Sequence, residues 1–317
     1  MTADVLPGQM RSAATAVLDA LGGEQRALAA RPFGDDAARR WLEYRPRSRP
    51  GACIADLSGA ARKAAHRLLA TALSEHAYAQ AMGIIALEEV LDRREDWCNS
   101  RHSGDYWVAV FGDPDGDRPW SWRFEGHHLS VTMTIADGEV SPAPVFLGAN
   151  PALVSYAGRP VSRPLGPEED LARALLSALG PAGRAAAVVS EAAPADIRTG
   201  TGPRAAERIE PAGIAAGRLG PTARAALRQL VALYLDRLPP ALAAREAARA
   251  DAGELHFAWE GPITPGLPHY YRVQGDDLLI EYDDTAPDGN HAHTVLRRPR
   301  GDFGGDVLAA HYRDAHA

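Results

Sequence analysis

Two short histidine motifs carry the strongest chemical signal in this sequence of 317 residues. His291 and His293 are separated only by Ala292. On a β-strand, side chains two residues apart point to the same face, so these two imidazoles would lie about 7 Å apart at the backbone. A His-x-His pair of this kind can offer a metal ion two nitrogen ligands.

The second motif is Gly126-His127-His128, inside a predicted long strand from Trp120 to Ile135. Alternation on a strand keeps one parity, but here the parity of the large apolar side chains changes at the motif. One extra residue, a β-bulge, would cause this change and would aim both histidines at one site. The apolar positions are even before the motif (Trp120, Trp122, Phe124) and odd after it (Leu129, Val131, Met133, Ile135).

Other polar residues could complete such a site. His311, in the predicted C-terminal helix, is the best further metal ligand by sequence. Glu125 and Glu281 are the best nearby carboxylates, as ligands or as proton acceptors. Arg123 alternates with Glu125 and would share its strand face. That arginine would either form a cross-strand ion pair or hold an anionic substrate group beside the metal.

These residues predict a metal-dependent enzyme acting on a small molecule. Imidazole-rich sites without thiolates suit iron, copper, zinc or manganese. Three histidines and open coordination positions permit water activation or oxygen chemistry. We favour oxidative chemistry, because the predicted ligands are nitrogen-rich and the pocket is aromatic. A metal-dependent hydrolase, a non-catalytic metal- or ligand-binding protein, and a protein whose histidines only form hydrogen bonds are the alternatives.

Composition argues against several other classes. The formal net charge of −7 gives no electrostatic reason to bind nucleic acid or an anionic membrane. The sequence contains no run of about 18 consecutive apolar residues, the length that would span a bilayer. Met1 to Arg11 lacks the apolar core of a signal peptide. Two cysteines are too few for a disulfide framework. We therefore expect a cytoplasmic protein with a small-molecule substrate, and the oligomeric state stays open.

The sequence contains a single lysine, Lys63, which argues against P-loop and pyridoxal enzymes. A P-loop requires a lysine after its glycines to reach the phosphates, and Lys63 follows no such motif. A pyridoxal enzyme would have to form its Schiff base on Lys63, whose surroundings do not suggest a cofactor site.

Strand and helix signals come in blocks and do not alternate, which predicts an α+β fold with a mainly antiparallel sheet. Helices are expected on both sides of the strand blocks, in the N-terminal part and in a central segment. Asp137-Gly138 is a tight-turn dipeptide, and Pro142 and Pro144 mark the return strand, Glu139 to Leu147, as an edge strand. We expect one domain, 1–317, with a helical part at 1–100, sheet strands at 105–150 and 255–298, a helical insertion at 167–251 and a closing helix at 306–316.

A series of motifs resembles domain-of-unknown-function family 3500. The similarity spans nearly the whole chain, and it implies that the two histidine motifs belong to one architecture. It supplies no established reaction, so the functional prediction rests on the residues. The matching stretches are Trp120–Ser130, Phe146–Pro151, Phe257–Gly261, Tyr270–Gly275, Leu279–Asp283, Asn290–Val295 and Asp302-Phe303-Gly304 through His311-Tyr312, with a weaker match at Trp41–Pro46.

Overall fold

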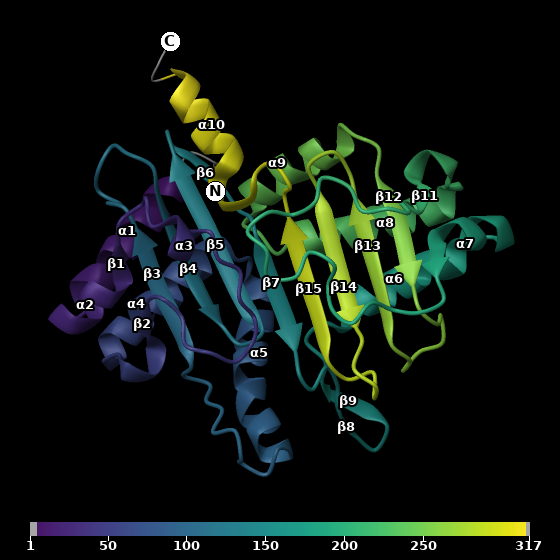
Figure 1. Cartoon of the computed structure of the whole chain (residues 1–317), viewed down its shortest axis with the longest axis horizontal. Helices are drawn as coiled ribbons and strands as arrows, with labels where there is room; N and C mark the ends of the chain where they lie inside the picture. The colour runs from purple at the N-terminus through teal and green to yellow at the C-terminus, as the bar shows by residue number, and fades with distance from the viewer. Residues whose placement is uncertain (1–4, 315–317) are drawn as a thin grey trace.

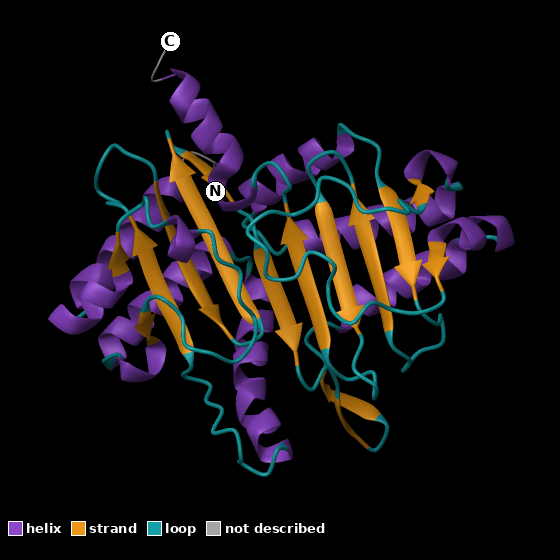
Figure 2. Cartoon of the chain, viewed as in Figure 1, coloured by secondary structure: helices purple, strands orange, loops and turns teal. Residues whose placement is uncertain are grey.

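The computed structural model describes the backbone of residues 5–314 and the side chains of residues 5–312. One large, mostly antiparallel sheet runs through the molecule (Figure 2). Helices α4, α5, α6 and α8 lie behind the sheet in the view of Figure 1, and extended loops cross its front. The predicted α+β class is therefore confirmed, with helices in the N-terminal and central parts of the chain.

The described helices fall in three blocks of sequence. None of them is both long and apolar enough to cross a membrane. Their bounds are α1 (Leu6–Ala20), α2 (Gly23–Ala29), α3 (Asp36–Arg39), α4 (Gly59–Ala72), α5 (Glu75–Arg94), α6 (Gly166–Ala178), α7 (Pro181–Ala187), α8 (Pro221–Leu235), α9 (Pro240–Asp251) and α10 (Gly305–Asp314).

The strands pair in the order β1-β3-β4-β5-β7-β15-β14-β13-β12-β10, with β2, β6 and β11 paired at the side. Only the β1–β3 and β10–β12 pairs are parallel among the described strands. A separate hairpin is formed by β8 and β9. The bounds are β1 (Ala30–Arg31), β2 (Ala52–Cys53), β3 (Tyr106–Phe111), β4 (Trp120–Gly126), β5 (Leu129–Ala136), β6 (Glu139–Ser141), β7 (Val145–Ala149), β8 (Val154–Tyr156), β9 (Arg159–Ser162), β10 (Val188–Ser190), β11 (Ile214–Ala215), β12 (His256–Glu260), β13 (His269–Gln274), β14 (Leu279–Asp284) and β15 (Ala292–Arg297).

The two faces of the sheet differ in chemistry. One face is apolar and packs against the helices in the main core, with side chains such as Trp122, Met133 and Leu147. The other face carries charged side chains that are nevertheless buried, including Arg123, Glu125 and Glu281. Two loops contact this polar face, and we call residues 40–51 the first covering loop and residues 191–213 the second covering loop.

The predicted long strand from Trp120 to Ile135, with a bulge at the histidines, is wrong. The chain reverses there, because β4 and β5 form a hairpin with His127 and His128 as its two-residue loop. Facing residues of such a hairpin have opposite parity: Trp122 pairs with Met133. A tight turn therefore produces the same parity change as a bulge. His128 occupies the left-handed region, with φ of 62°.

One other predicted element needs correction. The expected edge strand Glu139 to Leu147 is two strands, β6 and β7, with Pro142 and Pro144 between them. β7 lies inside the sheet, between β5 and β15, so it is not an edge. The Asp137-Gly138 turn is present, and both residues have positive φ as a type I′ turn requires. The closing helix corresponds to α10, and the last two residues of its predicted range, 315 and 316, lie outside the described part.

A buried ion pair joins the helix layer to the sheet. Arg237, just after α8, lies 2.6 Å from Glu168 of α6, and both side chains are inaccessible to solvent. Arg237 also donates to the hydroxyl of Thr294 in β15, and Gln80 of α5 donates to Glu168. Three helical segments and a central strand therefore meet at one charged pair.

We expect Arg237→Met to lower the free energy of unfolding by about 3–5 kcal/mol, because it leaves the Glu168 carboxylate buried without its cation. The double variant Glu168→Leu/Arg237→Met should lose less than the sum of the two single variants, since it removes both charges. Urea unfolding of all four proteins measures this coupling. Strictly additive losses would contradict the assigned role of the pair.

Candidate metal centre

Three histidines from two distant segments meet at one end of the sheet. His128 belongs to the β4–β5 loop, His291 precedes β15, and His293 lies in β15. One ring nitrogen from each lies within 4.8 Å of the others. This end is where β4 and β7 finish and β5 and β15 begin, at the lower edge of the sheet in Figure 1. We call these residues the histidine triad.

The spacing within the triad suits ligands of a single ion. Nε2 of His128 lies 2.8 Å from Nε2 of His291. Two nitrogens bound to one ion at about 2.1 Å would lie roughly 3 Å apart. Without an ion, one of the two rings must instead donate a hydrogen bond to the other. His293 completes the triad, with ring centroids 4.6 Å from His291 and 5.4 Å from His128.

Gly148 makes room for the triad. It lies in β7, between the strands that lead to the histidines, and it pairs directly with His293. A Cβ atom at this position would lie 2.8 Å from Cδ2 of His128 and 3.0 Å from Cδ2 of His293. Such contacts are too close, so any larger residue would push the two rings away from their present positions.

Two carboxylates hold His293 from the side of Nδ1. Asp283, its cross-strand partner in β14, lies 3.3 Å away, and Asp196 of the second covering loop lies 3.2 Å away. These contacts are ion pairs without hydrogen-bond geometry, because Nδ1 and both Asp283 oxygens lack a hydrogen-bond partner among the described residues. Asp196 also accepts from the hydroxyl of Tyr44, in the first covering loop. Asp196, Asp283 and His293 could themselves hold a metal.

The triad contains imidazoles of opposite protonation tendency. Burial alone would lower the pKa of His293, but Asp283 and Asp196 raise it to about 10. Burial and the neighbouring histidines lower the pKa of His291 to about 3. The same two causes hold the pKa of His128 well below its ordinary value. At neutral pH the rings of His128 and His291 are therefore neutral, as metal ligation requires. The ring of His293 carries a second proton, which a metal would displace.

The ring of His127 pairs with a carboxylate that is not shared with His291 or His293. Its Nδ1 lies 2.8 Å from Glu88 of α5, and its ring stacks on His128 with centroids 3.6 Å apart. His127 also lines a cleft of about 350 Å³ outside the sheet, together with Glu88. A carboxylate that orients an imidazole at a cleft is a common arrangement for proton transfer. Glu88, His127 and His128 form a further group that could hold a metal.

The other predicted site residues have structural partners instead. Arg123 donates to the carbonyls of Ala38 and Pro50. Glu125 accepts from Ser130 and pairs with Arg49. In the described part of the chain, neither is hydrogen-bonded or ion-paired to a histidine of the triad.

Glu281 and His311 are also placed elsewhere. Glu281 accepts hydrogen bonds from Tyr270 and from Thr199 of the second covering loop. Burial raises the pKa of the Glu281 carboxyl, as it does for the Glu125 carboxyl. His311 pairs with Asp137 at 2.8 Å, and Asp137 follows the far end of β5 from the histidine loop. The structure therefore brings together four of the five predicted histidine ligands but neither predicted carboxylate.

The carboxylates paired with the rings of His127 and His293 are Glu88, Asp196 and Asp283. Asp283 is detectable in principle, because it faces His293 once the β14–β15 register is known. Glu88 lies in a helix and Asp196 in a long loop, and no short-range pattern marks either of them.

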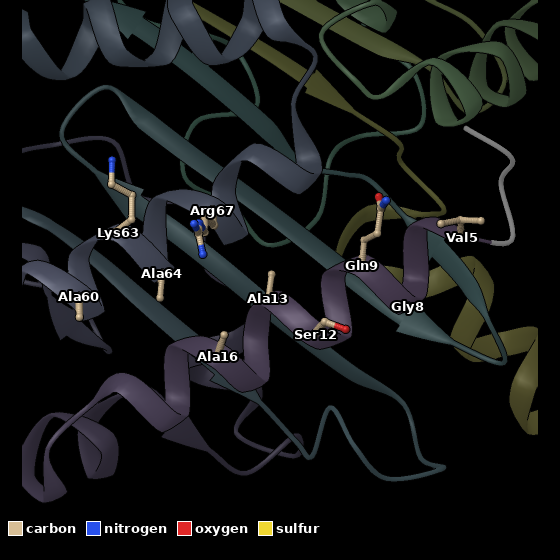
Figure 3. Close-up of a pocket in the computed structure, with 10 residues that line it drawn as sticks. All are labelled: Val5, Gly8, Gln9, Ser12, Ala13, Ala16, Ala60, Lys63, Ala64 and Arg67. Carbon is tan, nitrogen blue, oxygen red and sulfur yellow. The ribbon is translucent and has the colours of Figure 1, made fainter.

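A larger cavity elsewhere has no such chemistry. It measures about 890 Å³ and lies between α1 and α4, where small residues such as Ala13, Ala60 and Ala64 line it (Figure 3). Lys63 also lines it, but none of the described residues in its lining is a carboxylate or a histidine. We therefore place the candidate site at the histidines.

Comparisons with known proteins bear on the family and leave the activity open. No curated protein and no solved structure shows significant similarity to the chain. A family model described as a protein of unknown function, DUF3500, matches residues 5–305. Since this match covers nearly the whole chain, the protein belongs to the DUF3500 family.

Proposed function

We propose that the protein is a metal-dependent enzyme that acts on a small molecule at the histidine triad. The observation that carries the proposal is the convergence of His128 and His291, 163 residues apart in sequence, with a ring nitrogen of His293 within 4.8 Å of theirs. A bound transition metal would act as a Lewis acid or redox centre for the substrate. Asp283 and Asp196 would orient His293 and increase its basicity as a ligand.

The proton-transfer role belongs to His127 and Glu88 in this proposal. Glu88 holds Nδ1 of His127, so Nε2 is the nitrogen that can exchange a proton with a substrate in the cleft. Stacking on His128 keeps the His127 ring next to the triad. Glu125, Glu281 and Arg123 hold the covering loops and take no direct part in this scheme.

We favour oxidative chemistry, with hydrolysis as the second candidate. A thiolate-free set of nitrogen ligands suits iron and copper, and the stacked pair of Tyr44 and Phe146 lines His293 with aromatic surface. The same ligands also suit zinc, and the nearby carboxylates Glu88 and Asp196 could accept a proton from water.

We further propose a cytoplasmic location. The two free cysteines are compatible with it, and so is the finding that no described helix could cross a membrane.

We expect protein purified without chelator to contain about one equivalent of iron, copper, zinc or manganese per chain. His291→Ala/His293→Ala should lose this metal, because it removes two of three ligands. His291→Ala alone should lower the metal affinity strongly, since His291 belongs only to the triad. Elemental analysis after dialysis measures the content, and the element distinguishes redox from hydrolytic chemistry.

His311→Ala is the matched control, because that histidine is paired with Asp137 at the other end of β5. It should keep the full metal content. Retention of metal in the double variant would show that the triad is not the binding site. Retention in His291→Ala but loss in Asp196→Asn would place the ion at Asp196, Asp283 and His293 instead.

Metal affinity should rise with pH by about tenfold per unit between about pH 7 and 9. The sign follows from His293: its pKa of about 10 means that the free protein carries a proton there, and the metal must displace it. His128 and His291 contribute no further proton, since their pKa values are lowered. Competition with a chelator for zinc at several pH values measures the slope. A flat profile would exclude His293 as a ligand.

A further inference from the structure

The cleft beside His127 has the chemistry of a binding site for a small anion. It measures about 350 Å³ and lies between the first covering loop and the segment that links α5 to β3. Three arginines line it, together with the donors Ser48, Asn99 and Ser100. His127 and Glu88 line the same cleft, so a ligand held there could reach the proposed proton-transfer pair. The three arginines are Arg47, Arg49 and Arg101.

The three arginines differ in how far they are already engaged. Arg49 is buried, donates to the carbonyls of Arg47, Glu43 and Arg45, and pairs with Glu125. Its role is therefore to hold the first covering loop. Arg101 gives Nε and Nη2 to Glu95, and no described hydrogen bond occupies its Nη1.

Arg47 is the least engaged of the three. Its side chain is 50% exposed, and its ion pair with Glu43 has an N–O distance of 3.3 Å. Glu43 is meanwhile held by Arg45 through three closer contacts, from its backbone N–H, Nε and Nη2. Arg47 can therefore turn its planar guanidinium to a ligand, and that geometry matches the two oxygens of a carboxylate.

The charged residues of the lining favour a ligand with a single negative charge. Glu88 and Asp105 also line the cleft, and they would repel a second charge on the ligand. Trp107 supplies aromatic surface beside the guanidinium of Arg49, 5.4 Å from the ring centroid. A monocarboxylate with an apolar or planar remainder fits this combination better than a phosphate dianion.

We propose that this cleft binds the carboxylate group of a small organic acid, with Arg47 and Arg101 as its cationic partners and Trp107 against its remainder. The assignment names the substrate class of the proposed enzyme and so rests on that function for its catalytic meaning. It also moves the anion-binding role from Arg123, which is buried and bonded to backbone carbonyls, to arginines that reach the cleft.

Benzoate is a suitable probe, and benzamide is its uncharged counterpart. We expect benzoate to bind metal-free protein with a Kd of about 1 mM, a modest affinity appropriate to its size. Arg47→Gln should weaken binding about tenfold or more, because it removes a charge-assisted contact. Benzamide should also bind the wild type about tenfold or more weaker than benzoate does, because it lacks the charge. Isothermal titration of the full chain measures all three.

Arg94→Gln is the matched control. Arg94 is an exposed arginine in the last turn of α5, just before the segment that forms one wall of the cleft, and it does not line the cleft. Its variant should bind benzoate within about twofold of the wild type. Equal binding of benzoate by wild type and Arg47→Gln, equal binding of benzamide, or no benzoate binding at all would each overturn the proposal.

The experiment separates this proposal from the metal centre. Titrations use metal-free wild type and His291→Ala/His293→Ala, and metal content is measured separately on the same variants. Arg47-dependent benzoate binding by a chain that never takes up metal would support the cleft and refute the metal-dependent function. Metal binding without benzoate binding would refute the cleft and leave the metal centre intact.

Discussion

Charged side chains buried beneath loops must be paired, because an unpaired buried charge costs several kcal/mol. The polar face of this sheet is organised by that requirement. Its arginines and carboxylates bond to each other and to the backbone of the two covering loops, which fixes the loops over the strands. Those loops carry Tyr44 and Asp196 to His293, so the surroundings of the triad depend on pairing away from it. The contacts include Arg123 with Ala38 and Pro50, Arg272 with Glu260 and Pro211, Glu281 with Thr199, and Arg297 with Asp302 and Gly202.

The histidines lie where the two layers that cover the sheet come together. The helix layer supplies Glu88, from α5, to His127. The loop layer supplies Asp196 to His293. The sheet itself supplies Asp283 and the space above Gly148. The His127 and His293 rings are therefore each held by carboxylates from different parts of the fold.

How much was predictable depended on the range of the interactions. His291 and His293 were found because a strand alternates over two residues, and Asp137-Gly138 because a tight turn is local. Either a β-bulge or a tight hairpin turn can produce the parity change at Gly126, and the structure contains the hairpin. Arg123 and Glu125 do share a face, but only the tertiary structure shows that loops cover it. Glu88 and Asp196 reach the site from distant segments, so no local pattern could identify them.

The separation of His128 and His291 in sequence has a consequence for the order of folding. The β4–β5 hairpin closes a loop of two residues and can form while later parts of the chain are still being synthesised. Its histidines then wait for a partner that lies 163 residues further on, and closure over that distance is slow. During this interval the chain presents only one of the three histidines of the triad. Assembly of the triad is therefore a late step in folding.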